Sequence, residues 1–278
     1  MALSFTGDLA SLLLLALAMA AAGVLAGFIA GLLGVGGGIV VVPAVFQALT
    51  FMEMAPESRM HIAVGTSLAT IVATAFRSAR SHHARGAVDG ALLKSWGPAI
   101  LGGVALGSAI SGLVTGRVLT GIFGSVALIV ALYMAAVGHR VKLAEKLPGQ
   151  PLKSALGVLI GVVSAMMGIG GGTLSVPILS LCSYPIRYAV GTAAAIGLII
   201  AIPGTIGFIV TGWNVPGLPP FSLGFVNLIA LIAILPTTVA LAPLGARVAH
   251  AIPQTLLRLA FAGFLFIMSI RMLVETFG

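Results

Sequence analysis

One short stretch of this sequence occurs twice, and it restricts the fold more than any other feature. Residues 34–43 read GVGGGIVVVP, and residues 168–177 read GIGGGTLSVP. Both copies lie inside long apolar runs, where glycines and a proline weaken a helix. Because unpaired backbone groups are costly in hydrocarbon, segments that cross a membrane are normally unbroken helices. Paired interruptions at matching places in two halves are typical of inverted-repeat carriers, where they mark the substrate site.

The composition indicates an integral membrane protein. Of the 278 residues, 7% are charged and 59% are hydrophobic, whereas a soluble domain carries about 25% charged residues. The apolar runs do not alternate with polar residues, so we expect helices and not a β-barrel. The net charge of +8 comes from basic residues between the apolar runs, as the positive-inside rule predicts, and does not indicate a nucleic-acid partner. Cys182 is the one cysteine, which excludes an internal disulfide and a cysteine-based metal site.

The apolar segments form two sets of five. We expect them at 9–33, 43–52, 61–77, 91–114 and 118–138 and, after a polar connector at 139–151, at 152–169, 177–184, 188–211, 223–242 and 254–274. AVGTS at 63–67 matches AVGTA at 189–193, so the second set repeats the first in order. Because five is an odd number, the two copies must lie in opposite orientations. This predicts an all-α membrane protein with two inverted repeats, residues 1–138 and 152–278.

The distribution of Lys and Arg predicts which loops face the cytoplasm. Basic residues concentrate at 77–94 and 139–153, whereas the loop at 212–222 contains none. The positive-inside rule then places both termini outside, and Arg59, Arg117 and Arg271 are the exceptions. Residues 9–33 lack a basic start and are long for the core of a cleaved signal peptide, so we expect them to form the first membrane helix.

The prolines of the repeated block predict where two short helices begin. Pro43 and Pro177 suit the first position of a helix, where the missing N–H has no partner in any case. Each proline also favours an extended conformation for the residue before it, which is Val42 or Val176. We therefore expect the preceding helix to end at the glycines, an extended piece to follow, and a half-length helix to begin at the proline.

Such a helix start would lie deep in the protein with free N–H groups and the positive end of the helix dipole, which together bind anions. The predicted anion site consists of residues from both blocks: Gly36, Gly37, Gly38, Pro43, Gly170, Gly171, Gly172 and Pro177. The alternative is that these glycines only let helices pack closely. We expect that packing role for the regularly spaced Gly23, Gly27 and Gly31.

Other polar residues have two interpretations each. Thr66, Ser67 and Thr192 follow a glycine at the expected start of a helix; they could donate to an oxyanion or bond to the backbone of their own helix. His82, His83 and Arg85 form a basic loop that is either simply solvated or captures and gates the anion.

Several kinds of chemistry leave no trace in the sequence. All six acidic residues fall in or beside loops, which argues against a buried carboxylate relay. The sequence has no HExxH, Walker A or nucleophile-elbow motif, so we expect neither an enzyme nor an ATP-driven pump.

Both GxGGG blocks, the AVGTS stretch and the run SHHARGAVD at 81–89 resemble the TauE/SafE family of sulfite exporters, from about residue 20 to residue 275. The resemblance implies a bacterial inner-membrane carrier of sulfite, sulfonates or related sulfur-containing anions. With both termini outside, they would lie in the periplasm. Ala193 stands where the first half has Ser67, so an equal role for the two halves in binding is not expected.

We therefore expect a carrier that moves sulfite or an organosulfonate across the membrane by alternating access, with export as the expected direction. One alternative is a carrier of a carboxylate or of another inorganic sulfur anion, and a less favoured one is a membrane assembly subunit without transport. The expected partners are the small anion and the lipid bilayer, and a homo-oligomer is left open. No cofactor and no metal are expected.

Overall fold

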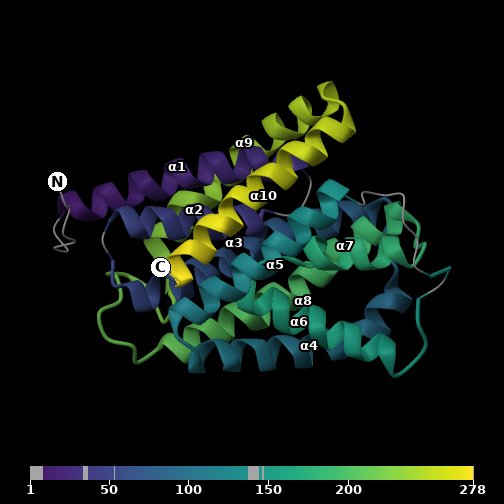
Figure 1. The fold of residues 1–278 in the computed structure, drawn as a ribbon, viewed down its shortest axis with the longest axis horizontal. Helices are drawn as coiled ribbons and strands as arrows, with labels where there is room; N and C mark the ends of the chain where they lie inside the picture. Colours follow the sequence, from purple (N-terminus) through teal and green to yellow (C-terminus); the bar gives the residue numbers. More distant parts are fainter. Residues whose placement is uncertain (1–8, 34–36, 53, 137–143, 146, 278) are drawn as a thin grey trace.

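The computed structural model describes residues 9–33, 37–52, 54–136, 144–145 and 147–277. The first half forms α1 (Leu9–Leu33), α2 (Gly38–Phe51), α3 (Pro56–Ala84), α4 (Gly90–Leu113) and α5 (Gly116–Ala136). The second half forms α6 (Leu152–Met167), α7 (Gly171–Leu181), α8 (Ile186–Gly212), α9 (Leu228–Ala251) and α10 (Gln254–Phe277), and a hairpin of β1 (Ser222–Leu223) and β2 (Val226–Asn227) precedes α9. The prediction of an all-α fold is confirmed (Figure 1).

Six of the described helices are long and apolar enough to cross a membrane: α1, α3, α4, α5, α8 and α10. The helices α2, α6 and α7 are apolar but shorter, and so is the apolar part of α9, residues 228–241. Large apolar side chains point outward from the long helices, for example Leu17, Ile129 and Ile206. Such an outer surface is unfavourable in water and matches lipid. The chain is therefore a multi-pass membrane protein.

Helices from the two halves pack against each other in pairs. α1 lies along α9, α4 along α6, α5 along α10 and α3 along α8, while α2 packs on α3 and α7 on α8 (Figure 1). Glycines allow the close approach, since a Cβ on Gly27 would lie 2.5 Å from the Cα of Thr238 in α9, and one on Gly107 of α4 would lie 2.6 Å from the carbonyl oxygen of Val162 in α6. The packing role predicted for Gly23 and Gly27 is confirmed, and that of Gly31 stays a prediction.

The two glycine blocks start their helices earlier than the prolines predicted. α2 begins at Gly38 and α7 at Gly171, so Pro43 and Pro177 lie inside these helices. The prediction of an extended piece ending at each proline is wrong. An extended stretch would leave several backbone groups unpaired in an apolar interior, whereas a helix pairs them and loses only the one hydrogen bond that proline cannot donate. Gly37, with φ 83°, supplies the turn that ends the break.

Five further positions differ from the sequence prediction. Thr66 and Ser67 lie in the middle of α3, and Thr192 lies in α8, so none of the three starts a helix. These helices begin near Pro56 and Pro185 instead, because proline is favoured at a helix start. His82 and His83 belong to the last turn of α3 and are not in a loop.

The start of α9 also differs from the prediction. The ninth helix begins at Leu228, after the hairpin, and not at residue 223. The turn of the hairpin consists of Gly224 and Phe225, and Gly224 has a φ of 53°, which favours glycine. The Asn227 side chain then accepts the N–H of Ala230 at 2.9 Å and so caps α9.

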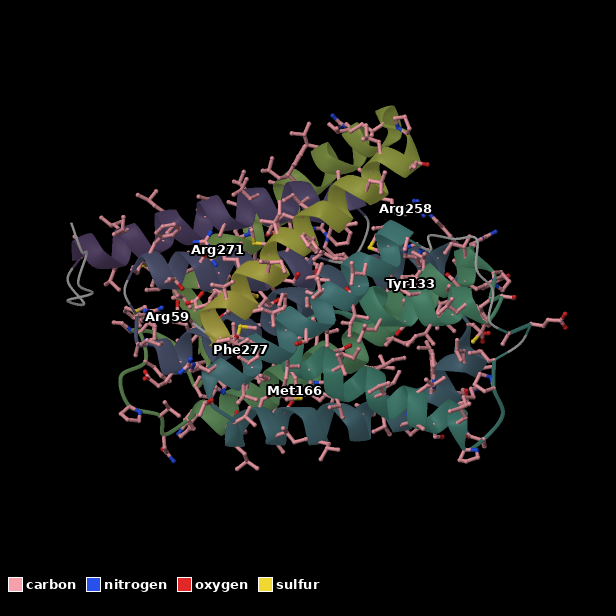
Figure 2. The ribbon with its side chains drawn as sticks, viewed as in Figure 1. Arg59, Tyr133, Met166, Arg258, Arg271 and Phe277 are labelled. Carbon is pink, nitrogen blue, oxygen red and sulfur yellow. The ribbon has the colours of Figure 1, made fainter. Side chains whose placement is uncertain are left out.

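The ends of the described chain lie on the same side of the molecule. The start of α1 and the end of α10 lie at the end that also carries the loop after α8, whereas α5 ends and α6 begins at the opposite end (Figure 1). Arg59 and Phe277 are found at the first end, and Tyr133 and Arg258 at the other (Figure 2). Arg59 lies 3.8 Å from the carboxylate of Glu275, which joins the start of α3 to the end of α10.

Candidate anion-binding site

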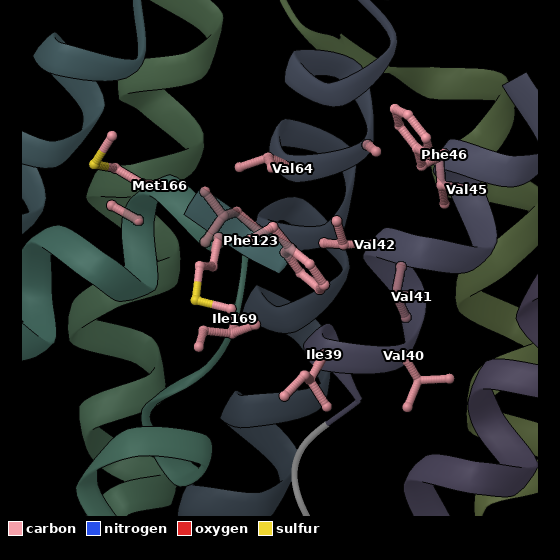
Figure 3. Packing of buried hydrophobic residues seen from close by; sticks show 14 of the residues in the cluster. Ile39, Val40, Val41, Val42, Val45, Phe46, Val64, Phe123, Met166 and Ile169 are labelled. Atoms are coloured by element: carbon pink, nitrogen blue, oxygen red, sulfur yellow. The ribbon is translucent and has the colours of Figure 1, made fainter. Parts of the chain in front are cut away.

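The two glycine blocks meet in the buried interior of the molecule. A Cβ on Gly38 would lie 2.7 Å from the carbonyl oxygen of Gly168 and 3.0 Å from the Cα of Ile169. Ile39 and Ile169 lie near each other in the packed core around the two blocks (Figure 3). The start of α2 therefore lies directly against the residues that connect α6 to α7.

The backbone of both blocks presents N–H groups at helix starts. The carbonyl oxygen of Gly37 accepts the N–H groups of Val40 and Val41 at 3.0 and 2.9 Å. The first N–H groups of a helix have no partner within it, and in α7 these belong to Gly171 and the residues after it. Gly37, Gly38, Gly170 and Gly171 are all buried. Gly36 lies outside the described residues.

The described glycines of the blocks differ in how crowded they are. A Cβ on Gly171 would lie 2.5 Å from the carbonyl oxygen of Ala193 and 2.7 Å from the backbone nitrogen of Gly197. A Cβ on Gly170 meets only the Ile71 side chain, at 3.5 Å. Gly170 also has a φ of −78° and a ψ of 172°, which any residue adopts.

The three predicted hydroxyl residues join distant segments of the chain. Ser67 donates its hydroxyl to the carbonyl oxygen of Gly168 at 2.7 Å. The hydroxyl oxygen of Thr66 accepts the N–H of Asn227 at 3.1 Å, and that of Thr192 accepts the N–H of Asp89 at 2.9 Å. The prediction of bonds to the residue's own helix is wrong, since these contacts bind neighbouring segments, and the role in anion binding stays a prediction. Ser67 places α3 beside the second glycine block.

Three buried hydroxyl residues in or near the second block were not predicted from the sequence. Thr173, Ser175 and Ser164 are buried, and their hydroxyl oxygens have no hydrogen-bond partner among the described residues. Thr173 is the third residue of α7, and its side chain is tilted toward the helix start, as all helical side chains are. An alignment of the two blocks would have identified Thr173, because the apolar Ile39 occupies the same position in the first block.

A basic pocket lies at the end of the molecule where α3 ends and α8 begins. It has a volume of about 560 Å³ and is lined by His82, Arg85, Ala87, Ile186, Arg187 and Val190. The Arg187 guanidinium donates to the carbonyl oxygen of Arg85, which leaves other N–H groups of the same side chain for an anion. His82 and Arg85 were predicted together with His83, which does not line the pocket. The contribution of Arg187 was not predicted.

Asp89 lies beside this pocket and caps α4. Its carboxylate accepts the N–H groups of Ala91 and Leu92 at 2.8 and 3.0 Å, and the Tyr184 hydroxyl donates to its second oxygen. The Tyr184 hydrogen bond and those from the backbone lower the pKa of Asp89 below its usual value of 3.8. Burial and the neighbouring carboxylate raise the pKa of Tyr184. Asp89 is therefore an ionised structural cap.

Comparison with known proteins agrees with this architecture. The family described as sulfite exporter TauE/SafE matches residues 19–272. A probable membrane transporter protein of Haemophilus influenzae is 35% identical over 254 residues, which are 91% of this chain and 96% of the relative. One of Methanocaldococcus jannaschii is 28% identical, over 90% of this chain and 94% of the relative. No solved structure matches. The chain belongs to the TauE/SafE sulfite exporter family of membrane transporters.

Proposed function

We propose that this protein carries a small sulfur-containing anion, sulfite or an organosulfonate, across a bacterial inner membrane by alternating access, in the direction of export. One observation carries the proposal: the starts of two short helices, one from each half, are buried at the point where Gly38 meets Gly168. An anion that enters an apolar interior must exchange water for hydrogen-bond donors. Helix starts supply such donors without a buried cation, which would hold the anion too tightly for release.

Thr173 extends this proposed site beyond backbone groups. Its buried hydroxyl lies on the first turn of α7, where it can donate to an oxyanion held by the N–H groups of Gly171 and Gly172. Ile39 stands in its place on α2, so the second block contributes more polar contact than the first.

The proposal includes an inverted repeat, which the helix pairing supports. If α6 to α10 repeat α1 to α5, then α1 along α9 corresponds to α6 along α4, and α2 on α3 corresponds to α7 on α8. The remaining pairs, α3 with α8 and α5 with α10, each join a helix to its own counterpart. This reciprocity is what a two-fold axis between the halves requires.

Transport by reconstituted protein tests the function. Liposomes that contain the purified protein are loaded with sulfite, and exchange of labelled sulfite is measured in competition with methanesulfonate, acetate and sulfate. We expect methanesulfonate to compete with the labelled sulfite for exchange. Competition by acetate alone would favour a carboxylate carrier, and the absence of exchange for every anion would favour a membrane assembly subunit.

Gly170→Ala tests the site within the same assay. The methyl group has room in the fold, since its nearest contact is at 3.5 Å, but it projects at the start of α7. Loss of one hydrogen bond to a charged group is worth about 1.5–3 kcal/mol, so we expect roughly a 10- to 100-fold loss of apparent affinity. Gly102→Ala is the control, because a Cβ there meets nothing within 4 Å. Wild-type transport by Gly170→Ala would place the anion elsewhere.

A further inference from the structure

Two ends of the molecule carry the same local arrangement. At one end Gly65 and Thr66 of α3 lie against residues 224–227, and at the other Gly191 and Thr192 of α8 lie against residues 86–89. In each, the threonine hydroxyl accepts the N–H of the residue that caps the following helix. In each, the glycine packs on a carbonyl group, that of Phe225 or that of Ala87. The two arrangements therefore place Phe225 and Ala87 at matching positions.

The end with Phe225 is filled. Phe225 is buried and stacks on the ring of His61, with ring centroids 4.7 Å apart. Phe208 packs against its edge at 6.4 Å, and the N–H of Phe225 donates to the Phe208 carbonyl oxygen at 3.1 Å. His61 is held in turn, because its Nε2 lies 2.8 Å from the carbonyl oxygen of Ser111. These contacts join α3, α4, α8 and the hairpin into one closed layer.

The end with Ala87 carries a pocket instead, although Ala87 itself is buried. Ala87 lines the pocket of about 560 Å³ together with His82, Arg85 and Arg187. Arg187 stands in the second half where His61 stands in the first, so the two ends differ in both residues. One end carries a stacked aromatic pair, and the other carries a small side chain beside cations.

Both arrangements lie close to the glycine blocks along their helices. A Cβ on Gly168 would lie 2.9 Å from the Cα of Val64, which is three residues along α3 from His61. At the other end, Ala193, whose carbonyl lies against Gly171, is three residues along α8 from Val190 of the pocket. Three residues of helix advance about 4.5 Å. The glycine blocks thus lie about one helical turn from His61 at the first end and from Val190 at the second.

We propose that Phe225 and His61 form the closed gate of the carrier and that the pocket of His82, Arg85 and Arg187 is the mouth through which an anion enters or leaves at the opposite end. The inference rests on the proposed transport function, since alternating access requires equivalent openings that are closed in turn. An apolar ring across a path excludes a hydrated ion. Cations at the open end raise the local concentration of anions.

The test uses thiol labelling with a membrane-impermeant charged reagent, in the full-length protein with Cys182→Ser. Ser67→Cys reports access past the gate, because Ser67 is fully buried and lies six residues along α3 from His61. Val190→Cys reports access to the pocket. With Phe225 present, we expect reagent added at the hairpin side to leave Ser67→Cys unmodified. Reagent added at the side of the pocket should modify Val190→Cys.

Phe225→Ala makes the closed end resemble the open one. A minor conformation of a carrier is populated at about 0.1–10%, so removal of the closing contacts is expected to raise labelling of Ser67→Cys by about tenfold or more. Labelling of Val190→Cys should fall as the population shifts. Phe123→Ala, at another fully buried phenylalanine, is the control for general loosening and should leave the first reporter unmodified.

Ala87→Phe is the converse variant and covers the case in which Phe225→Ala does not insert. A phenylalanine at this position should fill the pocket and reduce labelling of Val190→Cys by about tenfold. If Phe225→Ala and Ala87→Phe insert into the membrane and the labelling of both reporters is unchanged, the proposed gate is wrong. Labelling requires no transported anion, so a wrong substrate would leave this result intact, and a failed gate would leave the transport assay intact.

Discussion

Asp89 and Asn227 do the same structural work at opposite ends of the molecule. Each caps a helix with a side-chain oxygen, and each donates its backbone N–H to a threonine hydroxyl. Asp89 carries a charge, whereas Asn227 does not. Because an amide suffices at one end, the charge of Asp89 is not required for the cap itself.

Asp89→Asn is therefore expected to fold and to transport, whereas Asp89→Ala should lose about 1 kcal/mol of stability with the cap. The pKa of Asp89 is lowered from 3.8, first by the Tyr184 hydrogen bond. Because the pKa of this carboxyl is lower in the folded than in the unfolded protein, its ionisation stabilises the fold at pH values above the unfolded-state pKa. This contribution is lost as the pH falls through the folded-state pKa. The difference in melting temperature between wild type and Asp89→Asn should thus be constant from about pH 5 to pH 8.

Thermal unfolding in detergent, followed over this pH range, measures the effect on stability, and the liposome assay measures transport. A complete loss of transport in a stable Asp89→Asn protein would show that the carboxylate takes part in transport directly. We likewise expect that neutralising each of the other five acidic residues singly leaves transport intact, since no carboxylate relay is predicted among them.

At the scale of helices, glycine does two different jobs. In α1, α4 and α6 it lets helix backbones approach, and in the two repeated blocks it ends one helix and starts the next. The first job needs only the absence of a side chain. The second also needs a backbone conformation that other residues avoid, as at Gly37 and Gly168, whose φ angles are 83° and 65°.

Alanine at helix contacts should separate the helices. Gly27→Ala places a methyl group against the backbone of Thr238, and Gly161→Ala places one against the carbonyl of Ile100. Overpacking of this kind costs about 1–3 kcal/mol, so both variants should melt at a lower temperature than wild type. Gly102→Ala, with no contact within 4 Å, is the matched control. If all three variants melted together, the close approach would not contribute to stability.

At the scale of the whole molecule, charge separates the two ends. Arg77, Arg80 and Arg85 lie near the end of α3, on the side where α5 ends and α6 begins, while the opposite end carries the loop after α8 (Figure 1). By the positive-inside rule we expect the basic end to face the cytoplasm. The proposed open mouth would then face the cytoplasm, which is the side from which an exporter loads.

Cysteine labelling tests this orientation in the Cys182→Ser background. Gly149→Cys lies in the exposed α5–α6 connection, and Asn214→Cys lies in the exposed loop after α8. We expect an impermeant reagent added to intact cells to modify Asn214→Cys, and to modify Gly149→Cys only after the membrane is opened. The reverse pattern would invert the topology and make the open mouth periplasmic.

Much of this architecture could be predicted because hydrophobicity and chain order are local properties. The apolar runs predicted the number and order of the helices, and α1 was predicted at its observed bounds, 9–33. The pattern of glycines predicted the two breaks. The resemblance to the TauE/SafE family was visible from the same blocks, and the family match over residues 19–272 confirms it.

The tertiary structure decided what depends on distant partners. Local preference placed helix starts at Pro43 and Pro177, but the cost of unpaired backbone in a buried setting moved them to Gly38 and Gly171. Ser67 binds Gly168, 101 positions away, and no local signal identifies such a partner. The filled end at Phe225 and the open end at Ala87 likewise follow from which segments meet, because a side chain closes a path only where the opposite wall comes within its reach.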